Sequence, residues 1–469
     1  MMRFTRLTFL LLLIVLMTSA CERISVPPLP TSGPEDTEQP APTSTSISTP
    51  QRTPTPVDLI GVDESSLEGV EIELWHAWGS PQRELLEAQI ANFNRRNPWD
   101  ITVSARPFED WAALAEAVDQ AAESNELPGL IVSLPEYALG WNAEGKVVDL
   151  VNYVDHPKWG LTAAEIADIP KAFWDQDQMG EKRIGVPAER STRLLFYNAR
   201  WARELGFESA PENDVEFRDQ ACAANSQFRS DSVLSNDGFG GWIVDSDPQS
   251  ALSWLHSFGG GTVNEGAYEF ETDQNTQALV YLKELFDSSC AWIYTGLEPY
   301  SPLAEREALF VSGDLSELTE QGNAFSMAEN SDDWEVIAFP GGVERSIVAY
   351  GPSFNVIKTT PEKQLASWLF ARWMLKPEIQ TQWVKATGMF PLRKSSIKDL
   401  EGYASSHPQW AKAVALLGKA DIEPQKASWR TVKHVLADGT YSIFRLNLPT
   451  GDVPSVLEQM QATADDLDK

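Results

Sequence analysis

The sequence contains few of the residues on which metal and thiol chemistry depend, with three cysteines and five histidines among 469 residues. The histidines are scattered, and neither an H-E-x-x-H nor a C-x-x-C arrangement occurs. Without closely spaced ligands of this kind, the pattern predicts no metal site. The nucleophile-elbow motif G-x-S-x-G is missing, and the glycine run at 259–261 lacks the spacing of a dinucleotide site. We therefore expect no cofactor and no catalytic residues.

Basic residues are also scarce. Lys and Arg number 37 against 68 Asp and Glu, which gives a formal net charge of −31. Nucleic-acid binding needs a basic patch, and electrostatic adhesion to anionic lipid needs a basic cluster. The charge therefore argues against both as partners, but it does not identify a ligand, because net charge does not describe individual sites.

Only one long apolar run occurs, at residues 7–17. Arg3 and Arg6 precede it, and the small residues 18–20 follow it. The run is shorter than the ~20 residues that a membrane-spanning helix needs. A positive start, a short apolar run and a small-residue site are together typical of a secretory signal, so we expect residues 1–20 to be a signal peptide.

The next segment carries the signs of a tether. Cys21 directly after Ser-Ala resembles the bacterial lipobox, although Thr18 stands where that motif usually has Leu. The resemblance implies lipidation of Cys21 and anchoring to the outer face of the membrane; an ordinary cleaved signal with an unmodified cysteine is the alternative. Pro, Thr and Ser dominate residues 26–56, which cannot form a core, so we expect 21–65 to be a disordered linker.

The body from about residue 70 to 469 is too long for one hydrophobic core, and two domains are expected. Strand and helix patterns alternate, which predicts parallel βαβ units in open α/β sheets with flanking helices. The expected strands are 70–75, 101–105, 129–134, 183–187, 194–198, 334–339 and 355–358, and the clearest expected helices are 82–94, 111–123, 199–205, 274–286 and 361–375.

Two cysteines remain in the body, Cys222 and Cys290. An exported protein reaches an oxidising compartment, so an even pair favours a disulfide between them. Two buried free thiols are the alternative, since sequence spacing does not establish proximity.

Four segments of the body resemble the extracellular solute-binding proteins of ABC transporters, the group that includes the maltose-binding and glycerol-3-phosphate-binding proteins. They are Ile72–Trp78, Gly185–Asn198, Ser253–Gly260 and Tyr350–Lys394, and together they extend over most of residues 70–460. Each segment alone matches the family only loosely, and the resemblance rests on the order and spacing of all four. Met389 departs from it, because relatives often have Tyr there.

The resemblance implies a periplasmic-binding-protein type II fold with two lobes, a hinge and a ligand in the cleft between them. It assigns 70–187 and 337–386 to the first lobe and 188–336 and 387–469 to the second. It further implies a monomer that is not an enzyme, a carbohydrate or related polar solute as ligand, and ABC permease subunits as partners.

Candidate ligand contacts follow strands of the first lobe. Trp75 and Trp78 lie at the end of the first expected strand, Trp111 follows the second, and Glu136 and Tyr137 follow the third. Ligands bind at the carboxyl ends of strands in open α/β sheets, and indole faces with carboxylates suit a sugar. Loop packing is the alternative for the tryptophans, and capping of the next helix is the alternative for Glu136.

Further candidates come from the second lobe and the crossing between lobes. The comparison places Ser191 at the crossing, and Trp429 resembles the sugar-stacking Trp of the late helix in maltose-binding protein. Gly351 would allow a close approach of the backbone to ligand. Trp242 and Trp254 belong to the second lobe, where core packing is the alternative, and Arg393 is expected to be solvated. Trp75, Trp78, Trp242, Trp254 and Trp429 are predicted to converge with Glu136 on one cleft.

Two other functions remain open at this point. A lipid-anchored glycoside hydrolase would need two carboxylates facing each other across the cleft at roughly 5–10 Å. A sensor module would present the same ligand to a receptor instead of a permease.

Overall fold

The computed structural model describes residues 59–124 and 126–469. The chain divides into two units, Met1–Pro56 and Val57–Lys469, and every described helix and strand lies in the second unit. The signal peptide, Cys21 and most of the expected linker lie outside the described residues. Among the described residues, no helix is both long and apolar enough to cross a membrane.

The first sheet has the strand order β2-β1-β3-β16-β6. Its members are β1 (Glu71–His76), β2 (Thr102–Pro107), β3 (Leu130–Ser133), β6 (Val186–Pro187) and β16 (Ser353–Val356). β1 pairs in parallel with β2 and β3, whereas β16 runs antiparallel to β3 and β6. The parallel part is the βαβ arrangement that the alternating pattern predicts, with α1 (Gln82–Arg96) and α2 (Trp111–Ser124) as its connections.

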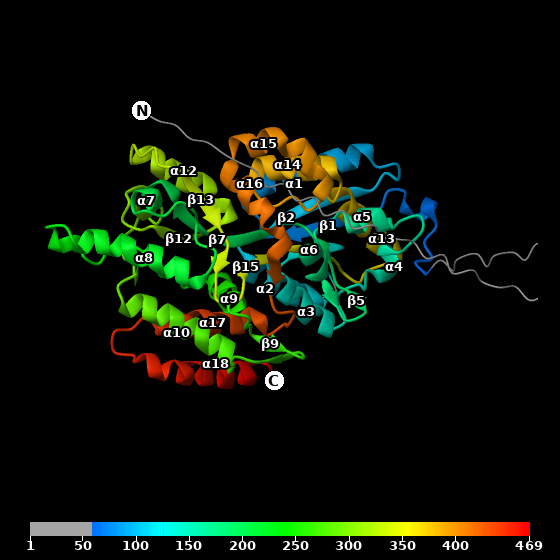
Figure 1. The fold of residues 1–469 in the computed structure, drawn as a ribbon. Coiled ribbons are helices and arrows are strands. Elements are labelled where there is room, and N and C mark those ends of the chain that lie inside the picture. The colour runs from blue at the N-terminus through cyan, green and yellow to red at the C-terminus, as the bar shows by residue number, and fades with distance from the viewer. Residues whose placement is uncertain (1–58, 125) are drawn as a thin grey trace, which may run out of the picture. The chain divides into compact units, whose positions relative to one another are not determined.

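The second sheet has the order β11-β8-β12-β7-β15-β14, and β13 and β17 pair with β7 and β15. Its members are β7 (Ser191–Asn198), β8 (Trp242–Ile243), β11 (Ala291–Trp292), β12 (Phe310–Asp314), β13 (Trp334–Ile337), β14 (Phe339–Pro340), β15 (Arg345–Tyr350) and β17 (Ala420–Ile422). We call the parts of the molecule built on the two sheets the first and the second lobe (Figure 1).

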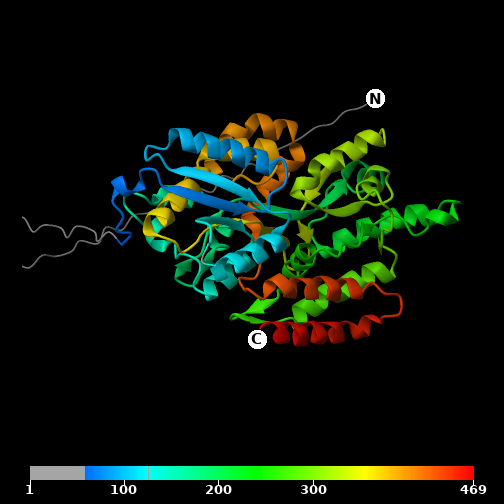
Figure 2. The ribbon, with the colours of Figure 1, turned by 180° about the vertical axis from the view of Figure 1, so that it is seen from behind.

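Helices cover the sheets of both lobes (Figures 1 and 2). Those that accompany the first sheet are α1, α2, α3 (Pro135–Ala143), α13 (Pro361–Met374) and α14 (Pro377–Thr387). Those that accompany the second are α7 (Ala199–Glu204), α8 (Asp214–Arg229), α9 (Pro248–Ser257), α10 (Asp273–Asp287), α11 (Ser301–Ala304), α12 (Leu318–Met327), α16 (Pro408–Ala415), α17 (Trp429–Ser442) and α18 (Val453–Leu467). Shorter helices are α4 (Val151–Val154), α5 (Ala163–Ala167), α6 (Lys171–Asp175) and α15 (Glu401–Ser406).

Two adjacent chain crossings connect the sheets, one from β6 to β7 and one from β15 to β16. Arg190 lies in the first crossing, and its buried guanidinium donates to the carbonyls of Gly351 and Pro352 in the second, at 3.1 and 2.6 Å. The same guanidinium forms an ion pair of 3.0 Å with the buried carboxylate of Asp177. The paired crossings are the structural counterpart of a hinge.

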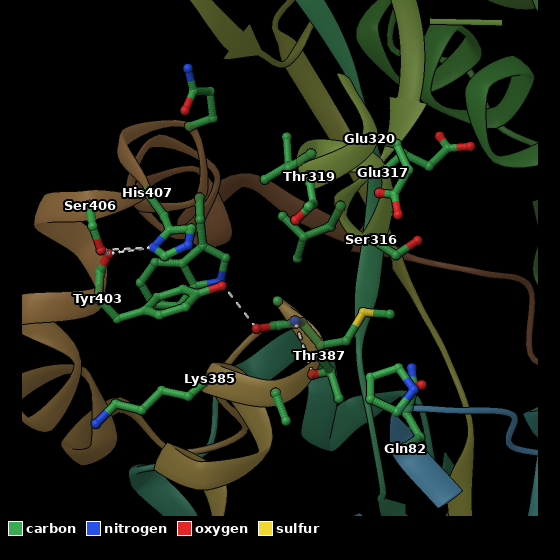
Figure 3. Close-up of a pocket in the computed structure, with 18 of the residues that line it drawn as sticks. Gln82, Ser316, Glu317, Thr319, Glu320, Lys385, Thr387, Tyr403, Ser406 and His407 are labelled. Atoms are coloured by element: carbon green, nitrogen blue, oxygen red, sulfur yellow. Dashed lines mark hydrogen bonds between the residues drawn. The ribbon is translucent and has the colours of Figure 1, made fainter. Parts of the chain in front are cut away.

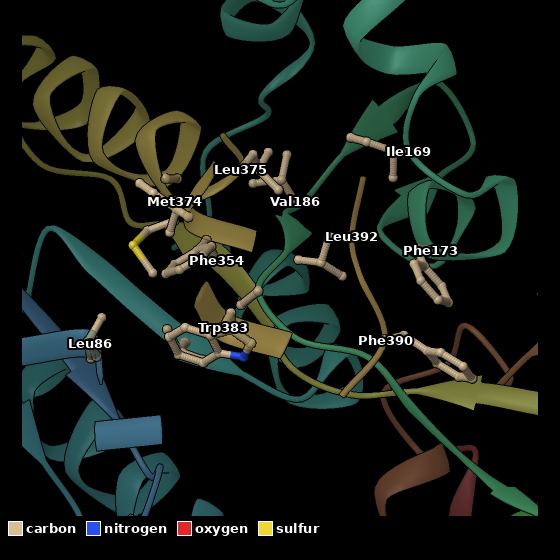
Figure 4. Close-up of a cluster of buried hydrophobic side chains, with 14 of the residues drawn as sticks. Leu86, Ile169, Phe173, Val186, Phe354, Met374, Leu375, Trp383, Phe390 and Leu392 are labelled. Carbon is tan, nitrogen blue, oxygen red and sulfur yellow. The ribbon is translucent and has the colours of Figure 1, made fainter. Parts of the chain in front are cut away.

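The largest hydrophobic cluster is shared by the two lobes, because it contains Leu74 and Phe354 of the first sheet together with Phe196 of the second. Figure 4 shows part of the cluster in which Phe354 of β16, Met374 of α13 and Trp383 of α14 pack together. A second cluster fills the space between the second sheet and its helices, including Phe217 and Leu436. The second lobe thus has one cluster of its own, whereas the first cluster continues from one lobe into the other.

The prediction of a two-lobed α/β fold is confirmed, and most expected strands and helices are present with shifts of a few residues at their ends. Two expected strands are divided: 183–187 is split between β5 (Lys182–Arg183) and β6, and 334–339 between β13 and β14. Cys222 and Cys290 form the predicted disulfide, with their Cα atoms 4.4 Å apart. The lobe boundaries stay a prediction. The pairing of β15 with β7 favours a first-lobe segment that begins nearer β16 than residue 337.

Candidate functional site

A cavity of about 850 Å³ lies between elements of the two lobes (Figure 3). Ser80 and Gln82 line it from the β1–α1 connection of the first lobe. Ser316 and Glu317, in the short helix η3 (Leu315–Glu317), line it from the end of β12 in the second. Strand β1 and strand β12 both end at this cavity, which is the position where open α/β sheets offer ligand sites.

Other polar side chains lie at the crossings and where elements of the two lobes meet. We call this set the polar band, and its members lie at a crossing, on β7, at or after a strand end, or on α3, α9 or α17: Glu136, Glu189, Ser191, Arg193, Asp245, Asp247, Gln249, Asp314, Tyr350, Glu423 and Lys433.

Glu189 lies at the crossing, fully buried, and accepts a hydrogen bond of 2.8 Å from the indole N–H of Trp383. Burial raises the pKa of Glu189 to about 7, although the indole donor acts in the opposite direction. A carboxyl group with this pKa is partly protonated near neutral pH, so it can donate as well as accept a hydrogen bond.

Ser191 begins β7 and donates a hydrogen bond of 2.8 Å to Asp314. The hydroxyl of Tyr350 donates to the same carboxylate oxygen. Burial and the Asp314 carboxylate raise the pKa of Tyr350 well above its ordinary value. Ser191, a predicted contact, thus lies in the polar band, and its two partners there were not singled out from the sequence.

Arg193 on β7 is surrounded by carboxylates. Its guanidinium is 3.0 Å from Asp245 and 3.7 Å from Asp247. Burial alone would lower the pKa of Arg193, but the two carboxylates raise this pKa above its ordinary value. This arrangement fixes carboxylate oxygens as hydrogen-bond acceptors at the carboxyl end of β8.

Helices α3 and α17 bring the two lobes into direct contact. Glu136 in the first turn of α3 is buried and forms an ion pair of 2.7 Å with Lys433 of α17. Burial and the Glu136 carboxylate together raise the pKa of the nearby Glu423 to about 7. Glu136 and Glu423 in turn raise the pKa of Lys433, against the effect of burial. The charges at this contact therefore depend on one another.

Trp429 begins α17 beside this contact. Its indole N–H donates a hydrogen bond of 3.0 Å to Glu423, which also accepts 2.9 Å from Gln249 of α9. Trp429 is 1% exposed. The side chain thus belongs to the polar band at its N–H and to the second core at its rings.

Tyr137 follows Glu136 on α3. Its ring is 5.4 Å from the guanidinium carbon of Arg430, which lies next to Trp429 on α17. Glu136 and Tyr137 are therefore together with Trp429 at the junction of the lobes, and this is the part of the predicted site that the structure assembles.

The structure does not bring the predicted tryptophans together on one cleft. Trp75 packs against Phe108 with ring centroids 5.1 Å apart, in a third cluster that also contacts Trp111. Trp78 packs against Trp383 at 5.0 Å. Both are buried: Trp75 lies on β1, an inner strand of the first sheet, and Trp78 lies in the connection between β1 and α1.

Trp242 and Trp254 pack against each other in the second core, with ring centroids 5.6 Å apart and 1% exposure each. This favours the packing alternative for both. Gly351 has φ of 140°, and a Cβ there would lie 2.5 Å from the carbonyl oxygen of Glu189. The backbone at Gly351, in the β15–β16 crossing, thus approaches the β6–β7 crossing closely. The expectation of a solvated Arg393 is wrong, since it is buried and 2.7 Å from Asp168.

The sequence profile of bacterial extracellular solute-binding proteins matches residues 88–417 of the chain. The chain belongs to this family. Among curated relatives, a putative binding protein of Brucella abortus (strain 2308) is 20% identical over 303 residues, which cover 63% of this chain and 70% of the relative.

Solved structures of similar fold are substrate-binding proteins. The sugar-binding protein MalE of Xanthomonas citri superposes with a TM-score of 0.73 at 18% identity, over 85% of this solute-binding protein and 97% of MalE. The cyclic alpha-maltosyl-1,6-maltose binding protein of Arthrobacter globiformis superposes with a TM-score of 0.71 at 18% identity, over 84% of this chain and 98% of that protein. UgpB of Mycobacterium tuberculosis, in complex with glycerophosphocholine, superposes with a TM-score of 0.65 at 14% identity, over 85% of this chain and 98% of UgpB. At these identities the likeness establishes the fold.

Metal-ion chemistry has no visible basis in the described part of this solute-binding protein, where no group of three or more His, Cys, Asp or Glu side chains is placed to hold an ion. The carboxylates of the polar band are instead bonded to Arg, Lys, Ser, Tyr and Trp donors. These bonds hold the carboxylate oxygens in fixed orientations.

Proposed function

We propose that this solute-binding protein captures a sugar or related polar solute between its lobes and delivers it to an ABC permease. The observation that carries the proposal is the junction of α3 and α17, where Glu136, Glu423 and Lys433 lie around the indole of Trp429. Carboxylates and a lysine suit the hydroxyl groups of such a solute.

Ligand entry at this junction requires the lobes to separate. Glu136 and Lys433 hold α3 and α17 together directly, at 2.7 Å, so a ligand between these helices would bridge or replace the pair. Rotation at the paired crossings around Arg190 is the motion that would separate them. Closure around a ligand would exclude water and give the permease a shape to recognise.

The remaining parts of the proposal concern the cell surface. The signal-like start and Cys21 support export and lipid anchoring, with residues 22–65 as the tether. Mass spectrometry of the protein purified from its native membrane would then find a diacylated or triacylated Cys21. An unmodified mature N-terminus elsewhere would remove the anchor.

The binding function can be tested on Val57–Lys469, the unit that contains every described helix, strand and disulfide. A thermal-shift screen would compare maltose, maltotriose, monosaccharides, polyols and glycerophosphocholine, because a ligand of the native state raises stability by RT ln(1 + [L]/Kd). We expect a hit among these, confirmed by calorimetry, with the ligand recovered unchanged by chromatography. Turnover of the ligand, abolished by Glu136→Gln, would instead establish a glycoside hydrolase.

A permease partner is tested in the cell. Deletion of the gene should abolish uptake of the ligand found in the screen, and expression of the intact chain should restore it. Normal uptake with loss of a transcriptional response to the same ligand would identify a sensor module instead.

A further inference from the structure

A second pocket, of about 350 Å³, lies in the first lobe at the ends of α1 and α14 that are remote from the cleft cavity. We call it the Trp99–Trp373 pocket. Gln82 at the start of α1 lines the cleft cavity, and Arg96 at its end lines this pocket. A helix of 15 residues is about 22 Å long, so the two sites are separate.

Aromatic rings form the wall of the pocket. Trp373 packs edge-on against Phe93, with ring centroids 5.6 Å apart. Trp99 is half-buried, and its indole N–H donates 2.8 Å to Glu64, close to where the described chain begins. The pocket therefore offers flat apolar surfaces to a ligand from both Trp99 and Trp373.

Four basic side chains line the same pocket, namely Arg96, Arg372, Lys376 and Arg393, against one acidic side chain, Glu165. Hydrogen bonds from Thr162 and the guanidinium groups of Arg372 and Arg393 lower the pKa of Glu165 although burial opposes this. This local excess of positive charge stands out in a chain with a formal net charge of −31.

Two of these cations have no anionic partner among the described residues. Arg393 pairs with Asp168 at 2.7 Å, and Arg372 is 4.0 Å from Glu165. Within residues 59–124 and 126–469, Arg96 and Lys376 have no carboxylate within 4.0 Å. The ammonium of Lys376 lies 4.0 Å from the ring centroid of Trp373, which holds a positive charge at the aromatic wall.

Solvated surface cations are the ordinary alternative, because exposed Arg and Lys need no partner. Four of them around a concave aromatic pocket, however, match a specific kind of ligand. An anionic group would pair with Arg96 and Lys376 at the rim, and an apolar ring or chain would lie against the indoles.

We propose that the Trp99–Trp373 pocket binds an amphiphilic anion, a molecule with a phosphate or carboxylate group joined to an apolar ring or chain. The occupant is a soluble metabolite or a phospholipid headgroup with its attached chains. Both sources present the same chemistry to the pocket.

The test uses residues 57–469 and three soluble probes in equilibrium dialysis, namely 1-naphthyl phosphate, 1-naphthol and inorganic phosphate. We expect one molecule of 1-naphthyl phosphate to bind, with 1-naphthol and inorganic phosphate each at least tenfold weaker. Arg96→Gln/Lys376→Gln should weaken binding of 1-naphthyl phosphate at least tenfold. Neither side chain forms a hydrogen bond or ion pair with another described residue, and Lys376 loses only its contact with the Trp373 ring, so this variant should melt close to the wild type.

The matched control is Lys398→Gln/Lys419→Gln, which changes the charge equally at two exposed positions outside the pocket. Equal binding of 1-naphthol and 1-naphthyl phosphate would overturn the proposal, as would equal loss in both double variants. Cosedimentation with phosphatidylglycerol but not phosphatidylcholine vesicles, lost in Arg96→Gln/Lys376→Gln, would identify the lipid source. Binding of the soluble probe alone would identify a metabolite.

Discussion

Lys433 of α17 and Glu136 of α3 form an ion pair of 2.7 Å that joins the two lobes. The side chain of Glu136 is 3% exposed and that of Lys433 is 16% exposed, so removal of the lysine leaves a buried carboxylate without its cation. Breaking a buried pair from one side costs about 3–5 kcal/mol. We predict that Lys433→Met lowers the free energy of unfolding, measured in urea, by about 3 kcal/mol, at the lower end of this range.

Two further variants make this prediction specific. Lys385→Met removes the same charge from an exposed side chain that lines the cleft cavity, and it should leave stability within about 0.5 kcal/mol of the wild type. Glu136→Gln/Lys433→Met removes both charges and should recover part of the loss. A Lys433→Met variant as stable as the wild type would show that the pair does not hold the lobes.

Trp429 and Trp254 provide a matched test of binding against packing. Both are 1% exposed, but the Trp429 N–H donates to Glu423 at the lobe junction, while Trp254 packs within the second core. Either change to Ala should cost about 3–5 kcal/mol of stability. Only Trp429→Ala should also weaken the ligand found in the screen, measured by calorimetry below the melting range. Normal affinity in Trp429→Ala would place the ligand elsewhere.

The fold could be predicted from the sequence because its signals are local. Period-two alternation marks β1, helical spacing marks α1, and the order of the elements predicts parallel pairing. The disulfide was also accessible, since an exported chain with two remaining cysteines favours a pair.

The site was less accessible, because it depends on which face of an element is covered. A strand-end tryptophan such as Trp75 looks the same in sequence whether it lines a cleft or a core. Lys433 and Glu423 acquire their role from the packing of α17 against α3, which joins positions 297 residues apart. No local spacing in the sequence predicts such a contact. Lys433 lies one helical turn after Trp429, however, and this spacing places the two side chains on the same face of a helix.

Glu189 should make stability depend on pH. Burial raises its pKa from 4.5 to about 7, so the folded protein binds a proton that the unfolded chain has released in this range. The stability that Glu189 contributes is therefore present below about pH 4.5 and is lost as pH rises to about 7. This contribution amounts to roughly 3 kcal/mol, at 1.36 kcal/mol per pKa unit.

The measurement is the free energy of unfolding of wild type and Glu189→Gln between pH 4.5 and 8. Gln keeps a carbonyl acceptor for the indole of Trp383 but does not titrate, so the wild type should lose stability relative to the variant as pH rises. Using the difference removes the opposite effect of His76, whose pKa burial lowers to about 4. A difference that is constant over this range would rule out titration of Glu189.

The Cys222–Cys290 disulfide should stabilise the second lobe without affecting the ligand site. Cys222 lies on α8 and Cys290 directly before β11, the edge strand of the second sheet. Asp245 and Asp247 of the polar band follow β8, the neighbour of β11, and the other members lie at the crossings, on β7 and β12, or on and near α3, α9 and α17. The bridge closes a loop with a sequence separation of 68, for which the chain-entropy model gives about 4 kcal/mol.

Cys222→Ser/Cys290→Ser should lose stability of this order and keep the affinity for the ligand. Reductant should lower the melting temperature of the wild type and leave that of the variant unchanged. Two free thiols titrated in the denatured, unreduced wild type would refute the bridge, and a variant that loses affinity while remaining folded would connect the edge of the sheet to the site.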